Sequence, residues 1–146
     1  MRALATGLLA CLIALPVFAE TEVADTNIAG HWTFEANIAE ECDFGGQAYL
    51  EKTGEDRFKG EVTARQSCIG LEEDYLVRQE CSASQLGNQL SVRCRIVEFV
   101  NGNDSQFYYP DNFTLTIESS ERLHGALVSS GMAKPAEWVR AERGIS

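Results

Sequence analysis

The chain has 146 residues, of which 12 are Lys or Arg and 22 are Asp or Glu, so its formal net charge at pH 7 is −10. A surface this acidic repels the phosphate backbone of nucleic acids and the head groups of anionic lipids, and we therefore expect no nucleic-acid partner. The length corresponds to one domain with a single hydrophobic core.

The first 19 residues have the pattern of a signal peptide. A short positive start, Met1-Arg2, precedes an apolar core over residues 3–15, and residues 17–19 form a small-x-small cleavage site. The apolar run is too short for a transmembrane helix, so we expect a periplasmic or secreted protein that does not span a membrane. Cys11 lies in a sequence that also resembles a lipoprotein cleavage box, which leaves a lipidated Cys11 as the alternative. Without residues 1–19 the chain keeps 11 basic and 22 acidic residues, a formal charge of −11.

A loose polar lead-in is expected over residues 20–29, followed by a single domain over residues 30–143. The domain begins with a segment in which Trp32, Phe34 and Ala36 alternate with polar residues, the period-2 pattern of a strand with one buried face. No stretch of the mature chain shows a convincing helical period.

Two hairpins follow, and each places two cysteines opposite one another. A three-residue loop at Gly54-Glu55-Asp56 pairs Leu50 with Gly60 and Cys42 with Cys68. A two-residue turn of the Gly-first type, at Gly87-Asn88, pairs Cys81 with Cys94 in the same way. Four cysteines in an exported chain permit three pairings, and the hairpin geometry favours Cys42–Cys68 and Cys81–Cys94.

The rest of the chain continues the strand pattern. Strand-like segments cover residues 106–109, 113–118 and 123–127, and residues 129–135 are expected to form a final loop before Trp138. Eight or nine strands result, depending on whether the first two of these segments form one bent strand. Consecutive hairpins this regular most simply close on themselves, so the sequence predicts an all-β fold, an antiparallel up-and-down barrel with two disulfides.

A Gly-x-Trp first strand, Gly30-His31-Trp32, and a late basic residue in the last strand resemble the calycin superfamily, which includes lipocalins, fatty-acid-binding proteins and avidins. The resemblance implies that Trp32 closes one end of the barrel and that Arg140 or Arg143 packs across it. A weaker resemblance, to bacterial periplasmic metalloprotease inhibitors, rests on the same strand followed by a cysteine. It implies that residues 20–27 would enter a protease cleft.

The leading functional hypothesis is a barrel that binds a small apolar or amphipathic molecule. An eight-stranded barrel is either filled by side chains or holds one small ligand. Inward positions such as Gly60, Ala64 and Gly125 would leave room for a ligand, and adjacent aromatics such as Tyr108 and Tyr109 often contact one at a barrel mouth. The residues that we expect to contact the ligand are Trp32, Phe34, Phe58, Tyr108, Tyr109, Trp138 and Arg140.

The sequence shows no motif for catalysis or for metal binding. The sequence contains no Gly-x-Ser-x-Gly elbow, zinc-protease helix or Gly-rich phosphate loop, so we predict a non-enzymatic protein without a cofactor. His31 and His124 fall on the face opposite the core, and no Cys-x-x-Cys pair exists, so no metal site is expected. The alternatives to ligand binding are a protein-binding module, such as a periplasmic protease inhibitor, and a structural envelope protein with a filled barrel.

Overall fold

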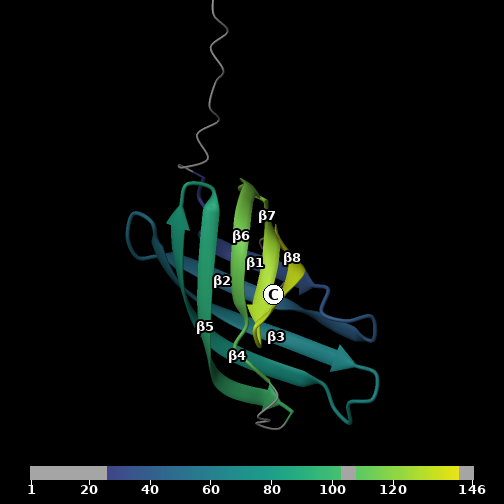
Figure 1. Ribbon diagram of the computed structural model, residues 1–146. Coiled ribbons are helices and arrows are strands. Elements are labelled where there is room, and N and C mark those ends of the chain that lie inside the picture. The colour runs from purple at the N-terminus through teal and green to yellow at the C-terminus, as the bar shows by residue number, and fades with distance from the viewer. Residues whose placement is uncertain (1–25, 103–107, 142–146) are drawn as a thin grey trace, which may run out of the picture.

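A computed structural model describes residues 26–102 and 108–141. These residues form a closed antiparallel barrel in which each strand pairs with its sequence neighbours and the last strand pairs with the first (Figure 1). The all-β fold is therefore confirmed, with eight strands. The strands are β1 (Gly30–Ala36), β2 (Cys42–Lys52), β3 (Arg57–Cys68), β4 (Tyr75–Leu86), β5 (Gln89–Asn101), β6 (Asn112–Ser119), β7 (Arg122–Ser129) and β8 (Met132–Arg140).

The choice between eight and nine strands is decided by the segment before β6. Residues 108–111 belong to no strand, and residues 103–107 lie outside the described part of the chain. The signal peptide, the alternative lipidation site at Cys11 and most of the lead-in also lie outside it. Among the residues described there is no helix with the length and hydropathy of a membrane span.

Both predicted hairpin registers are confirmed. Cys42 lies opposite Cys68 and Cys81 opposite Cys94, and both pairs form disulfides, with Cα atoms 4.0 and 4.1 Å apart. Gly87 has φ 58°, which fits a Gly-first turn between β4 and β5. Disulfides persist in oxidising compartments, so the two bonds suggest that the protein works in one.

The predicted final loop over residues 129–135 is wrong. The β7–β8 turn consists only of Ser130 and Gly131, which have φ values of 52° and 73°, and β8 already begins at Met132. Two consecutive positive φ values match the twist of a two-residue hairpin. Pro135 is accommodated inside β8 because of the direction in which its backbone points. Its carbonyl oxygen accepts a hydrogen bond from the Asn37 amide, just beyond the end of β1. The nitrogen of Pro135 points to the same side, where the strand pairing ends, so the missing N–H removes no hydrogen bond from within the ladder.

Two of the small residues expected to leave room inside the barrel, Gly60 and Gly125, do not do so. A Cβ added to Gly60 would lie 2.4 Å from the carbonyl oxygen of Tyr49, and one added to Gly125 would lie 2.2 Å from that of Thr114. These glycines therefore allow neighbouring strands to approach closely, which is how a curved sheet closes into a barrel. The interior is instead packed with large apolar side chains, the bulkiest of them Trp32, Trp138, Phe34 and Phe113.

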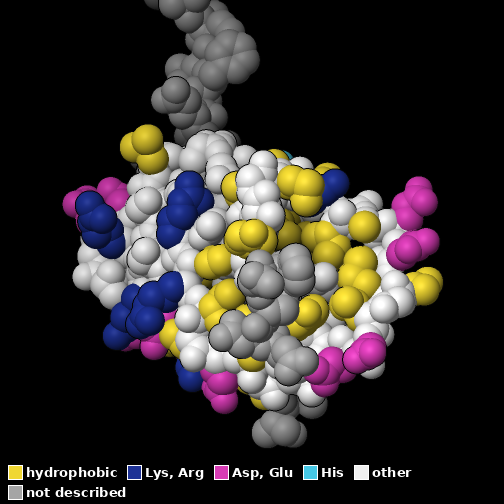
Figure 2. Space-filling model, turned by 60° about the horizontal axis from the view of Figure 1, so that its bottom comes forward, with side chains coloured by type: hydrophobic (Ala, Val, Ile, Leu, Met, Phe, Trp, Pro, Cys, Tyr) yellow, Lys and Arg dark blue, Asp and Glu magenta, His cyan; other side chains and the backbone are white. Residues whose placement is uncertain are grey.

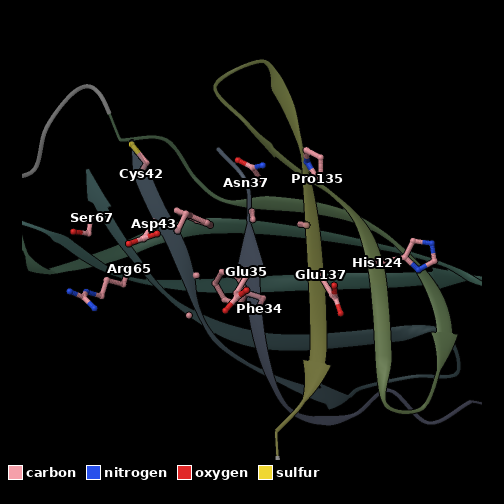
Figure 3. Close-up of a pocket in the computed structure, with 15 residues that line it drawn as sticks. Phe34, Glu35, Asn37, Cys42, Asp43, Arg65, Ser67, His124, Pro135 and Glu137 are labelled. Atoms are coloured by element: carbon pink, nitrogen blue, oxygen red, sulfur yellow. The ribbon is translucent and has the colours of Figure 1, made fainter. Parts of the chain in front are cut away.

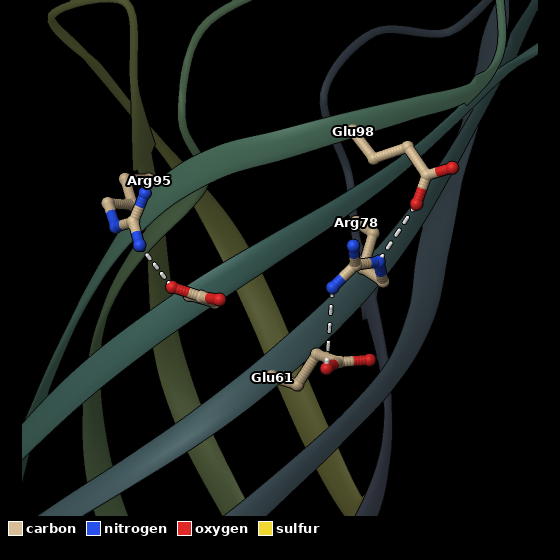
Figure 4. Close-up of polar contacts among 5 residues, drawn as sticks. Glu61, Arg78, Arg95 and Glu98 are labelled. Atoms are coloured by element: carbon tan, nitrogen blue, oxygen red, sulfur yellow. Dashed lines mark hydrogen bonds and ion pairs between the residues drawn. The ribbon is translucent and has the colours of Figure 1, made fainter.

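The outer face of the long strands carries ion pairs. Arg78 on β4 lies between Glu61 on β3 and Glu98 on β5, at 3.8 and 3.1 Å, and Arg95 on β5 pairs with Glu80 on β4 (Figure 4). All of these side chains are substantially exposed, so each pair contributes only about 0–1 kcal/mol to the free energy of unfolding. These pairs are therefore a minor contribution to the stability of the barrel.

Candidate ligand-binding site

One end of the barrel is closed by Trp32 and Arg140. The guanidinium carbon of Arg140 lies 4.2 Å from the centroid of the Trp32 ring. Its three nitrogens donate hydrogen bonds to the carbonyl oxygens of Ser120 (2.9 Å), Ala29 (2.5 Å) and Asn27 (2.8 Å). One side chain thus joins the β6–β7 turn and the segment before β1 across the Trp32 ring, as the calycin resemblance implied. Of the two arginines proposed for this contact, the structure places Arg140 there.

The Gly-x-Trp pattern has a clear physical role at this end. Gly30 has φ +118°, and a Cβ on it would lie 2.9 Å from an Arg140 nitrogen, so only glycine fits without strain. The indole N–H of Trp32 donates a 3.0 Å hydrogen bond to the carbonyl oxygen of Ile28. The chain therefore folds back over the Trp32 ring, which is fully buried. Arg143 lies outside the described residues.

Four of the residues expected to contact a ligand lie in the packed interior of the barrel. The ring of Trp138 stacks on that of Phe34 (centroids 5.7 Å apart) and lies 6.5 Å from that of Trp32, while Phe58 is 5% exposed on β3. Trp32, Trp138, Phe58 and the closing Arg140 line neither of the two depressions described below. The indole nitrogen of Trp138 is the one fully buried side-chain polar atom, among residues 26–102 and 108–141, without a hydrogen-bond partner.

The opposite end of the barrel contains a pocket of about 190 Å³, which we call the mouth pocket. Tyr108 and Tyr109 both line it, so the structure brings together the two aromatic residues that were predicted at a barrel mouth. Tyr108 is half-buried and Tyr109 is 48% exposed. The other lining residues are Ile38, Phe44, Gln66, Asp111, Leu127, Ser129, Ser130, Met132 and Lys134.

Hydrophobic side chains are also exposed at this end of the barrel. Figure 2 views this end of the molecule and shows apolar side chains gathered over it. Exposed apolar residues lie on the β3–β4 connection (Ile69, Leu71), near the end of β5 (Val100) and at the start of β8 (Met132). Large apolar side chains exposed together around a concavity are typical of a binding site.

A polar cluster lies at the inner wall of the mouth pocket. The carboxylate of Asp111, 2% exposed, accepts hydrogen bonds from the Tyr108 hydroxyl (2.7 Å) and from the side-chain amide of Gln79 (2.6 Å). Gln79 is fully buried, and its side-chain oxygen accepts a 2.9 Å bond from the Asp111 amide. Both bonds to the carboxylate end on Oδ2, and no described residue donates to Oδ1.

The electrostatics of this cluster are those of a desolvated carboxylate. Burial raises the pKa of Asp111 to about 6, although the hydrogen bonds from Tyr108 and Gln79 oppose the increase. Burial, together with the neighbouring Asp111 charge, raises the pKa of the Tyr108 hydroxyl, which therefore stays a hydrogen-bond donor. No described Lys, Arg or His side chain forms an ion pair with Asp111.

The sequence prediction missed this cluster, although one signal was present. Gln79 occupies an inward position between Val77 and Cys81, where a strand that faces a core normally carries apolar residues. A buried polar side chain at such a position requires a partner. The partner, Asp111, follows Pro110 in an irregular segment, where no periodicity predicts the direction of a side chain.

A larger depression of about 830 Å³ lies on the outside of the barrel, across β1, β2, β3 and β8 (Figure 3). Its walls include outward side chains of both charge signs, among them Glu35, Asp43, Arg65 and Glu137, and of the predicted ligand residues only Phe34 borders it. A wide charged surface leaves water in contact with any bound molecule, whereas small-molecule sites are concave and largely apolar. We therefore take the mouth pocket as the candidate site.

The two histidines lie on the outer face, as predicted. His31 is exposed and packs on Tyr49 with ring centroids 4.7 Å apart, and His124 is exposed with its Nδ1 atom 3.4 Å from Glu118. No group of three His, Cys, Asp or Glu side chains in the described part of the chain is arranged to hold a metal ion.

Comparison with known proteins finds structures with a similar fold but no matching protein family. No protein-family model matches the chain, and no curated protein sequence matches it significantly. Solved structures similar to it include a redesigned β-barrel, mFAP1, bound to DFHBI, with a TM-score of 0.60 and 10% sequence identity over 83% of this chain and 100% of that chain. A de novo designed fluorescence-activating β-barrel matches with a TM-score of 0.58 and 12% identity over 84% of this chain and 99% of that one. These likenesses show that the chain shares the closed antiparallel barrel fold with designed proteins.

Proposed function

We propose that this chain is an exported, calycin-like barrel that binds a small apolar or amphipathic molecule in the mouth pocket. The observation that carries the proposal is the pocket itself, in which apolar walls meet a buried polar cluster of Asp111, Gln79 and Tyr108. Ligand sites typically combine apolar lining with a few converging polar groups that fix orientation. The protein is exported to an oxidising compartment, in keeping with its two disulfides.

The shape of the barrel supports binding at one end only. Trp32 and Arg140 close the far end, and large aromatic rings fill the middle. A volume of about 190 Å³ is smaller than most drug-sized sites. We therefore infer that the ligand is small, or that it inserts one end and rests the remainder on the apolar rim. The designed barrel mFAP1, bound to DFHBI, supports the idea that a barrel of this architecture can hold a small molecule.

A pair of tryptophan substitutions tests the location of the site. Gln66 lines the mouth pocket and is partly buried, so the larger side chain of Gln66→Trp occupies the pocket. Leu86 is 85% exposed on the β4–β5 hairpin, and Leu86→Trp adds the same ring outside the pocket. In titrations with the neutral fluorescent probe N-phenyl-1-naphthylamine, we expect Gln66→Trp to weaken binding at least about tenfold and Leu86→Trp to leave it unchanged. Absence of probe binding to the unmodified protein, or equal binding by both variants, would contradict the proposal.

The alternative of a protease inhibitor remains a prediction, because residues 20–25 lie outside the described part of the chain. Any truncation must keep Asn27, since its carbonyl oxygen accepts a hydrogen bond from Arg140. Removing residues 20–25 leaves a ligand-binding barrel with its affinity for the probe. An inhibitor would instead lose its effect on a metalloprotease while the probe still bound.

A further inference from the structure

We propose that the mouth pocket selects molecules in which an ammonium group is attached to an apolar body, and that the carboxylate of Asp111 binds this group. The inference rests on the proposed function and specifies the chemistry of its ligand. It follows from three features of the pocket: an open position on a buried carboxylate, aromatic walls, and the acidity of the whole protein.

The first feature is the geometry of the Asp111 carboxylate. Its Oδ2 atom accepts both hydrogen bonds, from Tyr108 and Gln79, whereas no described residue donates to Oδ1. Asp111 lines the mouth pocket although it is 2% exposed, so a group that reaches it must come through the pocket. A buried carboxylate without a cationic partner is costly, and an ammonium group would supply both the missing hydrogen-bond donor and the compensating charge.

The second feature is the ring content of the walls. Tyr108, Tyr109 and Phe44 line the same pocket as Asp111. The faces of aromatic rings attract cations, and ammonium groups on organic ligands are commonly recognised by several rings together. The ring of Tyr108 is held by Tyr75 and Phe99, whose centroids lie 5.4 and 5.9 Å from its own. Its position is therefore set before a ligand arrives.

The third feature is the field of the protein. The formal net charge is −10, which raises the local concentration of cations and lowers that of anions around the barrel. Lys134 is the one cationic side chain among the described residues that line the pocket, and it is partly exposed on β8. Asp111 is almost completely buried, so its charge is less screened by water than that of Lys134 and has the stronger effect on a group inside the pocket.

Binding of an ammonium group to Asp111 carries a pH dependence. Because the pKa of Asp111 is about 6, the carboxylate is almost fully ionised at pH 7.5 and only about one-tenth ionised at pH 5. Asp111 is the one carboxyl group among the described residues that line the pocket, and the other titratable side chains there are the phenols of Tyr108 and Tyr109 and the amine of Lys134. We therefore expect the affinity for an ammonium ligand to fall about tenfold from pH 7.5 to pH 5, while a neutral ligand of the same length is unaffected.

Displacement of N-phenyl-1-naphthylamine by three ligands of equal chain length tests the inference. Octylammonium, 1-octanol and octanoate differ only in the head group. At pH 7.5 we expect octylammonium to bind at least about tenfold more tightly than octanol, which corresponds to one charge-assisted hydrogen bond. Asp111→Asn abolishes the preference, and Asp43→Asn, which removes an exposed carboxylate from the outer face, retains it.

The other outcomes overturn the proposal in distinguishable ways. Equal displacement by octylammonium and octanol refutes recognition by Asp111 but leaves a ligand-binding mouth. Tightest binding of octanoate, lost in Lys134→Gln, assigns the pocket to anions. Failure of the probe to bind refutes the proposed function itself. Should Asp111→Asn not fold, the comparison of pH 7.5 with pH 5 on the unmodified protein decides, because octylammonium affinity that does not change with pH contradicts the proposal.

Discussion

The two buried tryptophans of the barrel should differ in what they contribute to stability, although they are of equal size and burial. Trp32 and Trp138 are both fully buried, and replacing either by Phe removes a similar volume from the core. Their indole N–H groups differ, since that of Trp32 donates to the carbonyl oxygen of Ile28 and that of Trp138 has no hydrogen-bond partner among the described residues. The comparison of Trp32→Phe with Trp138→Phe therefore isolates the polar part of the effect.

The difference can be estimated from these contacts. Trp32→Phe leaves the carbonyl oxygen of the fully buried Ile28 unpaired, which costs about 1–3 kcal/mol, and weakens the cation–π contact with Arg140 by about 0.5–1 kcal/mol. Trp138→Phe also loses packing, but it removes a buried N–H donor that has no partner in the described part of the chain. Removing this donor restores about 1–3 kcal/mol of the free energy of unfolding and so offsets part of the packing loss. We expect Trp32→Phe to be the more destabilising substitution by about 2.5–7 kcal/mol.

Equilibrium unfolding in urea, with the disulfides intact, measures this difference directly. In thermal unfolding, the same difference would separate the midpoint temperatures of the two variants by roughly 10–30 °C for a domain of this size. A third variant, Arg140→Lys, keeps the positive charge and loses the planar group that reaches three carbonyl oxygens, so it should behave like Trp32→Phe. If Trp138→Phe proves as costly as Trp32→Phe, the closure of the barrel by hydrogen bonds is refuted.

Three further perturbations have defined outcomes. The pKa of Asp111 is about 6 in the folded protein and its ordinary value is 3.8, so the folded state binds the extra proton and loses about 3 kcal/mol of stability as the pH rises from about 3.8 to 6. In urea unfolding, the stability of Asp111→Asn relative to that of the unmodified protein should therefore be higher at pH 7 than at pH 4. The same difference in stability at both pH values would contradict this. Gly125→Ala places a Cβ 2.2 Å from the Thr114 carbonyl oxygen and should destabilise by about 1–3 kcal/mol in the same assay, whereas an unchanged midpoint would show that the strands separate freely. Replacing Cys81 and Cys94 together by Ala opens a loop of sequence separation 13 and should cost about 3 kcal/mol, and no change on treating the unmodified protein with reductant would argue against that bond.

The regular part of the fold was predictable because independent local signals agreed. The turn at Gly87-Asn88 and the alternation of apolar residues chose the same register as the pairing of Cys81 with Cys94, and the structure has that register. The closed end was predicted from the calycin resemblance, which implied that Arg140 or Arg143 packs across Trp32. The contact between Trp32 and Arg140 joins the first and last strands, whose adjacency follows from closing the barrel.

The open end was less predictable because it depends on departures from regularity. The register between β4 and β5 shifts next to Gln79, so counting from the turn no longer gives the partner of a residue beyond that point. Asp111 belongs to a segment without secondary structure, and its meeting with Gln79 spans 32 positions of the sequence. Pro135 suggested a loop where β8 in fact continues, because the sequence does not show that its missing N–H lies beyond the end of a ladder.

The seam between β5 and β6 is the place where the described strands are least extensively paired, and Asp111, which lines the mouth pocket, directly precedes β6. β5 pairs with β6 only from Gln89 to Val92, the shortest run of pairs between neighbouring strands, and then continues along β4 alone. Two register shifts between β4 and β5 lie in this last part, and bulges bend a strand away from its partner. Side chains bridge the widened seam, since Asn112 accepts a hydrogen bond from the Cys94 amide and Asp111 is bonded to Gln79. Of these bridging side chains, Asp111 also lines the mouth pocket, so a group that binds its carboxylate would contact one of the residues that hold this seam together.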